Sequence, residues 1–402
     1  MTRRNRGAIA ALSAILVVGC TPSTQPAPHE PGAAATSTSA TVAAHGVEAA
    51  LGTIPWGQVG PGWMLATWSP APGRGSGEPP PGQPTVGSVP TSLFLVNPNG
   101  GRYPIATFAP SGDGPTMMLG DWSGDGSHAL LYMNTAAGLT VTTVDLHSGR
   151  QTSFTVDGSN LIPHYSRPRG KAIVLAKWRD TEPASLRRVD LAGKPELTYP
   201  VGPEFQGSFL STPDGTKLVL GSAAGLALMG NDGAAGKVLP VPGGHDCAPA
   251  RWWDAGSTVV LARCLDHYLP RLWLVPIDGH PVTALTAPLT GHDQDLGDVN
   301  AWQLPAGIFV QDEGACGSEY LGKLSRVGGT TTPVSVPEVA PHSSVHVTGV
   351  SGSHLRLQAT VSCGSGESLL DYDPGADASV VLLGPPLNGG GVIAAVPYPG
   401  QG

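Results

Sequence analysis

Residues 208–230, SFLSTPDGTKLVLGSAAGLALMG, contain the clearest structural pattern in this chain of 402 residues. An apolar run ends in the turn TPDG at 212–215, and a second apolar run follows over 217–221. A third run covers 225–229, and a fourth covers 237–241 after a turn that contains Asp and Gly. Four short apolar runs separated by tight turns predict four strands of one antiparallel sheet.

The glycine of the first turn can be followed through the chain at a nearly constant spacing. Its successive positions are Gly126, Gly170, Gly215, Gly256, Gly307 and Gly352, which are 44, 45, 41, 51 and 45 residues apart. An earlier copy of the unit is centred on WSP at 68–70, with partner strands at 92–96 and 103–108. The sequence therefore contains seven copies of a four-stranded unit of about 45 residues.

A four-stranded repeat of this length is typical of a β-propeller blade. A blade buries its sheet faces only against its neighbours, so the blades must close into a ring. We therefore predict an all-β fold, a single β-propeller domain of seven four-stranded blades over residues 47–402, in which the apolar segment 391–398 pairs with the first blade. The alternative for the fold is a protein of two β-sandwich domains, and the alternative for residues 391–398 is a final tail outside the ring.

The turn STPDG at 211–215, between two apolar strands, resembles the blades of TolB-type propellers, which also occur as the propeller of prolyl-oligopeptidase-like enzymes. The resemblance covers about residues 62–399, and only this blade approaches the family turn. It implies the propeller fold and a scaffold role of the TolB kind. Peptidase activity is not implied, since the chain has no Gly-x-Ser-x-Gly motif and no helical domain after the blades.

The first 46 residues differ from the rest of the chain. Residues 1–6 hold three arginines, residues 7–18 are uncharged and mostly apolar, and VVGC at 17–20 ends the segment. This pattern predicts a signal peptide over 1–19, and VVGC resembles the bacterial lipobox, which implies lipidation of Cys20. Residues 20–46 are rich in Pro, Ala, Thr and Ser, which predicts a flexible tether. The alternative is an ordinary secretory signal in which Cys20 is incidental.

The chain is acidic, with a net charge of −8 that becomes −11 when the three N-terminal arginines are removed. No cluster of Lys or Arg remains after residue 19, which argues against binding to nucleic acid. Few lysines and many Ala, Gly and Pro residues are typical of a GC-rich actinobacterial genome. We expect an exported monomer that the lipid on Cys20 holds at the outer face of the cell membrane, in the cell envelope.

Four cysteines remain when Cys20 is set aside, an even number for an oxidising compartment. Cys247 begins the first strand of the fifth unit and Cys264 ends the second, so the two lie on antiparallel neighbours. Cys316 and Cys363 fall at the hairpin between the second and third strands of the last two units. We predict the disulfides Cys247–Cys264 and Cys316–Cys363, because the four lack the spacing of a zinc site.

Histidines and acids gather in the segments predicted to join one blade to the next. These loops lie on one face of a propeller, and convergent His and carboxylate side chains can hold a metal or a polar ligand. We expect this face to bind a ligand or protein rather than a transition metal, and the alternative is that the side chains are merely solvated. The candidate residues are His164, His245, Asp246, His292, Asp293, Asp295 and His342.

A calcium loop is a further candidate, since Asp121, Ser123 and Asp125 place oxygen atoms at alternating positions. Ala129 stands where similar propeller loops carry their last Asp, and no Glu closes the loop. The same residues form a turn of the repeat, so an ordinary strand–strand turn is the preferred alternative. We expect no resident metal and no cofactor.

The sequence offers no catalytic motif, since the His-Glu-x-x-His, Walker and Rossmann patterns are all missing. We therefore expect a cell-envelope lipoprotein whose non-catalytic propeller is a binding scaffold for an envelope protein or a cell-wall ligand. The alternative is an extracytoplasmic enzyme, such as a lyase, hydrolase or dehydrogenase, that uses the His- and Asp-rich connecting loops.

Overall fold

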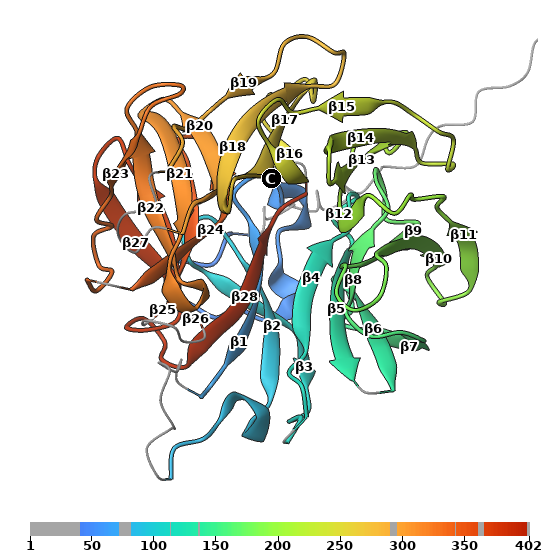
Figure 1. Ribbon diagram of the computed structural model, residues 1–402. Coiled ribbons are helices and arrows are strands. Elements are labelled where there is room, and N and C mark those ends of the chain that lie inside the picture. The colour runs from blue at the N-terminus through green and yellow to red at the C-terminus, as the bar shows by residue number, and fades with distance from the viewer. Residues whose placement is uncertain are drawn as a thin grey trace, which may run out of the picture. The chain divides into compact units, whose positions relative to one another are not determined.

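The computed structural model describes residues 41–71, 82–112, 114–135, 137–289, 296–341, 343–360 and 366–399, with only the backbone described at Cys316, Gly366 and Glu367. The regular secondary structure of these residues is almost entirely β-strand (Figure 1). The helical segments among them are single 3₁₀ turns, namely η1 (Leu51–Thr53), η2 (Trp56–Gln58), η3 (Val86–Ser88) and η4 (Ala315–Gly317). Nowhere in the described ranges is a helix long and apolar enough to cross a bilayer.

The strands pair mainly with their sequence neighbours, in antiparallel sets of four. The first set contains β28 (Gly391–Pro397), β1 (Met64–Ser69), β2 (Thr91–Val96) and β3 (Arg102–Phe108). The others are β4 (Met118–Trp122), β5 (His128–Thr135), β6 (Gly138–Asp145) and β7 (Gln151–Val156); β8 (Leu161–Tyr165), β9 (Ala172–Lys177), β10 (Ser185–Asp190) and β11 (Pro195–Thr198); β12 (Phe205–Ser211), β13 (Lys217–Ser222), β14 (Gly225–Gly230) and β15 (Val238–Pro240); β16 (His245–Trp252), β17 (Val259–Asp266), β18 (Leu269–Pro276) and β19 (Thr283–Ala284); β20 (Asp298–Leu304), β21 (Gly307–Glu313), β22 (Glu319–Leu324) and β23 (Thr331–Pro333); and β24 (Ser344–Ser351), β25 (His354–Thr360), β26 (Gly366–Asp373) and β27 (Ala378–Leu383).

The set that contains β1 is completed from the other end of the described chain. β28 pairs antiparallel with β1, from Met64 opposite Pro397 to Ser69 opposite Gly391. The predicted pairing of segment 391–398 with the first blade is therefore confirmed. The sequence pattern makes the strand that ends at WSP (68–70) the first strand of its blade. The strand order β28-β1-β2-β3 corrects this assignment, because β1 is the second strand of its set.

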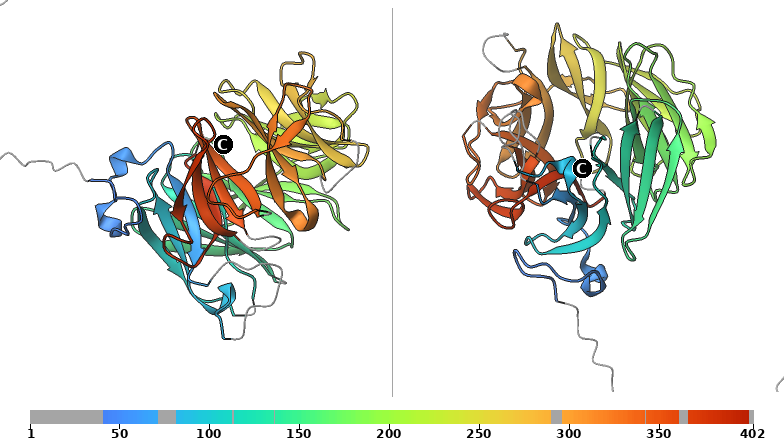
Figure 2. Two further views of the ribbon diagram at one scale, coloured as in Figure 1. Left: turned by 90° about the vertical axis from the view of Figure 1, so that its left-hand side faces the viewer. Right: turned by 90° about the horizontal axis from the view of Figure 1, so that it is seen from below.

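The sets succeed one another around a common centre, with the first strand of each set near that centre and the fourth strand on the outside (Figures 1 and 2). Each set contacts the next, for example through β4 and β8, β12 and β16, and β22 and β24. The last set contacts the first, since β24 touches β28. This ring of antiparallel sheets is a β-propeller architecture.

Two neighbouring sets are joined into one hydrogen-bonded sheet. β12–β15 and β16–β19 form an eight-stranded sheet because Ser222 of β13 pairs with Cys247 of β16. This is the single position at which the two strands are paired. The remaining sheets have four strands each within the described residues.

Burial follows position in the ring. β9 and β13 are second strands, and their side chains are buried at nearly every position because neighbouring sets cover both faces of the sheet. The fourth strand β11 is mostly exposed. Continuous apolar runs such as AIVLA at 172–176 are therefore explained by two-sided burial, whereas an alternating pattern belongs to strands covered on one face.

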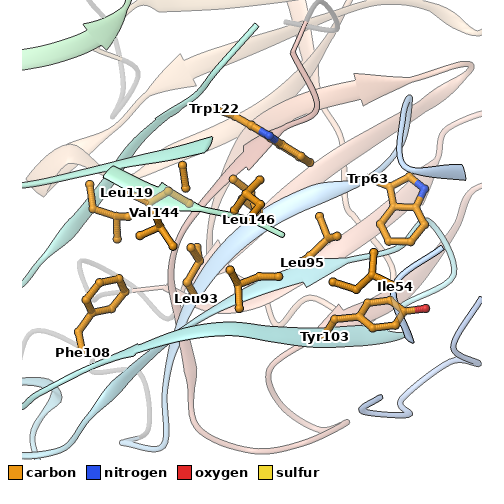
Figure 3. Close-up of a cluster of buried hydrophobic side chains, with 14 of the residues drawn as sticks. Ile54, Trp63, Leu93, Leu95, Tyr103, Phe108, Leu119, Trp122, Val144 and Leu146 are labelled. Atoms are coloured by element: carbon orange, nitrogen blue, oxygen red, sulfur yellow. The ribbon is translucent and has the colours of Figure 1, made fainter. Parts of the chain in front are cut away.

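The core between the β28-β1-β2-β3 set and the β4–β7 set shows how the sheets pack (Figure 3). Trp63, Tyr103 and Trp122 supply its large aromatic side chains, and each is at most 3% exposed. The rings of Trp63 and Tyr103 stack with centroids 6.0 Å apart. Aliphatic side chains fill the space between them, including Leu93, Leu95, Leu119 and Leu146. Burial of this apolar area is the main force that holds adjacent sheets together.

The described end of the predicted tether lies against the first sheet. Ala43 is 9% exposed, its N–H donates to the Tyr103 hydroxyl over 2.8 Å, and its carbonyl accepts from Asn97 Nδ2 over 2.7 Å. Glu48 adds an ion pair with Arg102 at 3.0 Å. Residues 1–40, including the predicted signal peptide and Cys20, lie outside the described residues.

Candidate functional site

A pocket of about 280 Å³ lies where four successive sets approach the centre of the ring. Its walls come from β8, β9, β12, β16, β17 and β20, so no single blade forms it. We call it the central pocket and define it by its polar residues and its larger apolar ones. These are His164, Ser208, Arg263 and Asn300, with Trp178, Phe209 and Pro249.

Local strand geometry explains which side chains reach the central pocket. In β8, Leu161, Pro163 and Tyr165 are buried between the sheets, so the alternate residues Ile162 and His164 face the pocket. In β12, Gly207 has a φ of +95°, and a Cβ there would lie 2.5 Å from the Trp178 Cα. Glycine at this position therefore lets β12 approach the end of β9 closely.

His164 lies against an aromatic ring. Its imidazole meets the Phe209 ring edge to face, with centroids 5.5 Å apart. Burial lowers the pKa of His164, Asp121 opposes that effect, and Arg167 adds to it, so the net shift is downward from the ordinary value. His164 is therefore neutral at neutral pH and offers the pocket one donor and one acceptor without a charge.

The charge of the central pocket comes from Arg263. Among the described residues its guanidinium has no hydrogen-bond or ion-pair partner. Ser208 is also incompletely bonded, because its hydroxyl oxygen is buried and has no hydrogen-bond partner. Unpaired donors that line a cavity are the groups that a polar ligand would satisfy.

A second arginine stands beside the pocket. Arg251 lies over the Trp302 ring, 5.4 Å from its centroid, and its Nε and Nη1 atoms are buried without hydrogen-bond partners. Burial lowers the pKa of Arg251 to about 10. The adjacent residues Pro249 and Ala250 line the pocket itself.

The structure tests the placement of three predicted binding residues. His164 lies within β8 and lines the central pocket, whereas the sequence placed it in the preceding loop. His245 and Asp246 begin β16, are exposed, and do not line the pocket. His245 Nδ1 lies 3.0 Å from Asp246 Oδ2, and its Nε2 lies 3.1 Å from the carbonyl of His267. His292, Asp293, Asp295 and His342 lie outside the described residues.

The disulfide between Cys247 and Cys264 is present, as predicted, and it ties β16 to β17 at the end of their sheet. Both cysteines are at most 1% exposed. This bond fixes the two strands that carry Arg251 and Arg263. The second predicted disulfide, Cys316–Cys363, lies outside the described side chains.

The candidate calcium loop makes the contacts of a turn. Asp121 accepts hydrogen bonds from Tyr165 N at 2.8 Å and Arg167 Nη2 at 2.9 Å, so it joins β4 to the next set. Asp125 Oδ1 accepts from the Ser123 hydroxyl at 2.7 Å. No group of three or more His, Cys, Asp or Glu side chains in the described part of the chain converges as metal ligands would. The turn interpretation accounts for these contacts.

Sequence reasoning missed the arginines and Asn300. A signal for Arg263 was present, because it is the single charge in the apolar run VVLARCL at 259–265. A charged residue inside a strand that is otherwise buried implies a partner or a function. Arg251 in CAPARWW at 247–253 carries the same signal. No local sequence pattern marks Asn300, because this residue reaches the pocket only through the packing of β20 in the ring.

No protein family model matches the chain, and no curated protein matches it. Among solved structures, TolB from Acinetobacter baumannii is 12% identical, with 84% of this chain and 66% of that chain covered and a TM-score of 0.41. Prolyl oligopeptidase B from Galerina marginata is 11% identical. The match covers 73% of this chain and 47% of that chain, with a TM-score of 0.48. The β-propeller domain of Cps50 (Swd1) from Myceliophteria thermophila is 12% identical, with 70% and 90% covered and a TM-score of 0.47. This chain thus spans less than two thirds of the TolB chain and about half of the prolyl oligopeptidase chain.

Proposed function

We propose that this chain is an exported lipoprotein, anchored through Cys20, whose seven-bladed propeller binds a ligand in the central pocket without transforming it. The blade count treats β12–β15 and β16–β19 as separate blades, because one bridge joins them. A disulfide at Cys247–Cys264 suits an oxidising compartment outside the cytoplasm.

The central pocket is the observation that carries the binding function. It collects polar side chains from separate sheets, and two of them, Ser208 and Arg263, have unused donors. Phe209 and Pro249 supply apolar walls beside them. Ligand sites combine an apolar lining with a few convergent polar groups, as this pocket does.

Binding is favoured over catalysis by the contacts of the same residues. A serine nucleophile needs a base within hydrogen-bond reach, and the Ser208 hydroxyl has no such partner. His164 contacts the Phe209 ring, and no carboxylate orients its imidazole through a hydrogen bond among the described residues. These groups are suited to holding a ligand in place.

A ligand screen tests the binding function. The full-length protein, purified in detergent, would be scanned for thermal stabilisation by a library of envelope metabolites and peptides. We expect stabilising compounds whose effect disappears in Ala248→Leu, because the larger side chain fills the pocket. Ala192→Leu, at an exposed turn, is the matched control and should keep the effect. Failure of every compound, or conversion of one into a product, would overturn the proposal.

The anchor is tested separately in cells that express the full chain. Cys20→Ala should remove incorporation of a palmitate analogue and release the protein from the membrane fraction, because Cys20 is the proposed lipid attachment site. Cys247→Ala, which removes a different cysteine, should leave labelling intact. Continued membrane association and labelling of the Cys20→Ala protein would refute the anchor.

A further inference from the structure

Two arginines lie on the same face of the sheet formed by β16 and β17. Arg251 is opposite Leu261, and Arg263 is opposite Ala248. Leu261 and Arg263 are two residues apart in β17 and therefore point to the same side. Cross-strand partners share a face as well, so both guanidinium groups leave the sheet on the side of Leu261.

Arg251 and Arg263 lack the acidic partners that pair with Arg167 and Arg356. Arg167 lies 2.9 Å from Asp121, and Arg356 lies 2.7 Å from Asp371. In the described residues Arg251 and Arg263 have no such ion pair. The contrast is notable in a chain with a net charge of −8, where acids outnumber basic residues.

Leaving Arg251 in this position is energetically costly. Two of its nitrogen atoms are buried without partners, and burial is the cause that lowers its pKa. The Trp302 ring offsets part of that cost through a cation–π contact. A buried cation without an anionic partner destabilises the protein, and a bound anionic ligand would offset that cost.

We propose that the central pocket binds a small organic anion, whose oxyanion group pairs with Arg263 in the positive field of Arg251. This inference rests on the proposed function, since it specifies the ligand of the same pocket. The Ser208 hydroxyl and the Asn300 amide supply further donors, and Phe209 and Pro249 pack against the apolar part of the ligand. A volume of about 280 Å³ suits a molecule the size of a substituted ring.

Carboxylates and phosphonates share the chemistry that an arginine recognises. The test therefore compares benzoate and phenylphosphonate with benzamide and benzamidine, four ligands with one ring and different charges. Isothermal titration calorimetry on the full-length protein in detergent measures each affinity. We expect at least one of the two anions to bind about tenfold or more tightly than benzamide, with benzamidine weakest. The tighter anion identifies whether the pocket prefers a carboxylate or a phosphonate.

The arginines are tested by substitution. Arg263→Gln should weaken anion binding by about tenfold or more, while Arg263→Lys, which keeps the charge, should retain the preference for anions over benzamide. Arg251→Met should weaken anion binding by a smaller factor and raise the Tm of the unliganded protein, because it removes an unpaired buried cation. Arg326→Gln, at an exposed turn, is the matched control and should change neither.

Three results would overturn the inference. They are equal binding of benzamide and benzoate, an anion affinity that Arg263→Gln leaves unchanged, and no binding of either anion up to about 10 mM. If any of these occurs while the library screen still yields a ligand lost in Ala248→Leu, the pocket binds its ligand without an arginine–oxyanion pair, and the proposed function stands without this inference. If the screen also fails, the proposed function falls with it.

Discussion

The Arg356 side chain lies within the β24–β27 sheet and is 3% exposed. Its Nη1 lies 2.7 Å from Asp371 Oδ1, and the other carboxylate oxygen of Asp371 lies 2.8 Å from His354 Nδ1. Burial lowers the pKa of Arg356, and the negative charge of Asp371 opposes that shift. The charge of this arginine is thus balanced inside the protein, unlike that of Arg251.

Removing the balancing charge should be costly. We expect Asp371→Asn to lower the free energy of unfolding by about 3 kcal/mol, because it leaves the Arg356 cation buried without an anion. Glu196→Gln is the control, since Glu196 pairs with Arg188 where both side chains are at least 25% exposed, and its loss should cost less than about 1 kcal/mol. Urea denaturation measures both. A similar cost for the two variants would contradict this account.

The residues of the candidate site show what a single sequence can predict. The sequence predicts His164 as a binding residue because it falls where one blade joins the next, and it lies in the pocket. Its partners Ser208 and Asn300 come from β12 and β20, and no local pattern brings these strands together. Only the closed ring does so. Side chains that meet across blades therefore stay outside the reach of sequence periodicity.

At the scale of elements, the turns between first and second strands share one hydrogen-bonding pattern. Asp125, in the turn between β4 and β5, accepts hydrogen bonds from the hydroxyls of Ser123 and Ser127. Asp214, in the turn between β12 and β13, does the same with Thr212 and Thr216. The repeated aspartate thus closes the turn with its own side chain, which explains why the unit is visible in the sequence.

These hydrogen bonds to the turn aspartate predict that the stability of the protein depends on pH. Burial raises the pKa of Asp125, but hydrogen bonds from Ser127 and Ser123 outweigh it, so the pKa lies below its ordinary value of 3.8. A lowered folded-state pKa adds stability above the unfolded-state pKa, and that stability is lost as the pH falls through the folded-state value. Asp125→Asn should therefore cost about 1 kcal/mol at pH 7.

The loss of stability caused by Asp125→Asn should become smaller as the pH is lowered. Urea denaturation at a series of pH values should show a constant difference between wild type and Asp125→Asn down to about pH 5, and a decreasing one below about pH 4. Asp157→Asn, at an exposed loop position, controls for the general effect of one charge. A difference that persists unchanged at pH 3 would show that the carboxylate charge is not responsible.

The register of the strands was predictable wherever the unit is continuous. The strands around TPDG at 212–215 lie at 205–211 and 217–222, as the pattern of turns and apolar runs requires. In the first unit, WSP at 68–70 ends a second strand instead of a first one. The reason is physical, because the missing first strand is β28, and pairing over more than 300 residues leaves no local signal.

At the scale of the whole molecule, closure of the ring depends on that distant strand. β28 pairs with β1 and also contacts β4 and β24, so it connects the first, second and last sheets. Val392 within it is fully buried, as are Leu65 and Ala66 of β1. Without β28 the edge of β1 would be open, with unpaired backbone groups and exposed apolar side chains.

A chain that ends at Gly390 should therefore lose its native state. We expect a stability loss of more than about 5 kcal/mol, comparable with the stability of a whole domain, and association of the open β1 edges between molecules. A chain that ends at Pro399 is the control, because it keeps β28 and the hydrogen bond from Tyr398 N to the Trp63 carbonyl, 2.9 Å long. Light scattering measures association, and urea denaturation measures cooperativity.

A peptide of residues 391–399, added to the chain that ends at Gly390, should restore the monomer if the closing strand alone is missing. If the chain without β28 is instead monomeric and unfolds cooperatively, the ring does not need this strand.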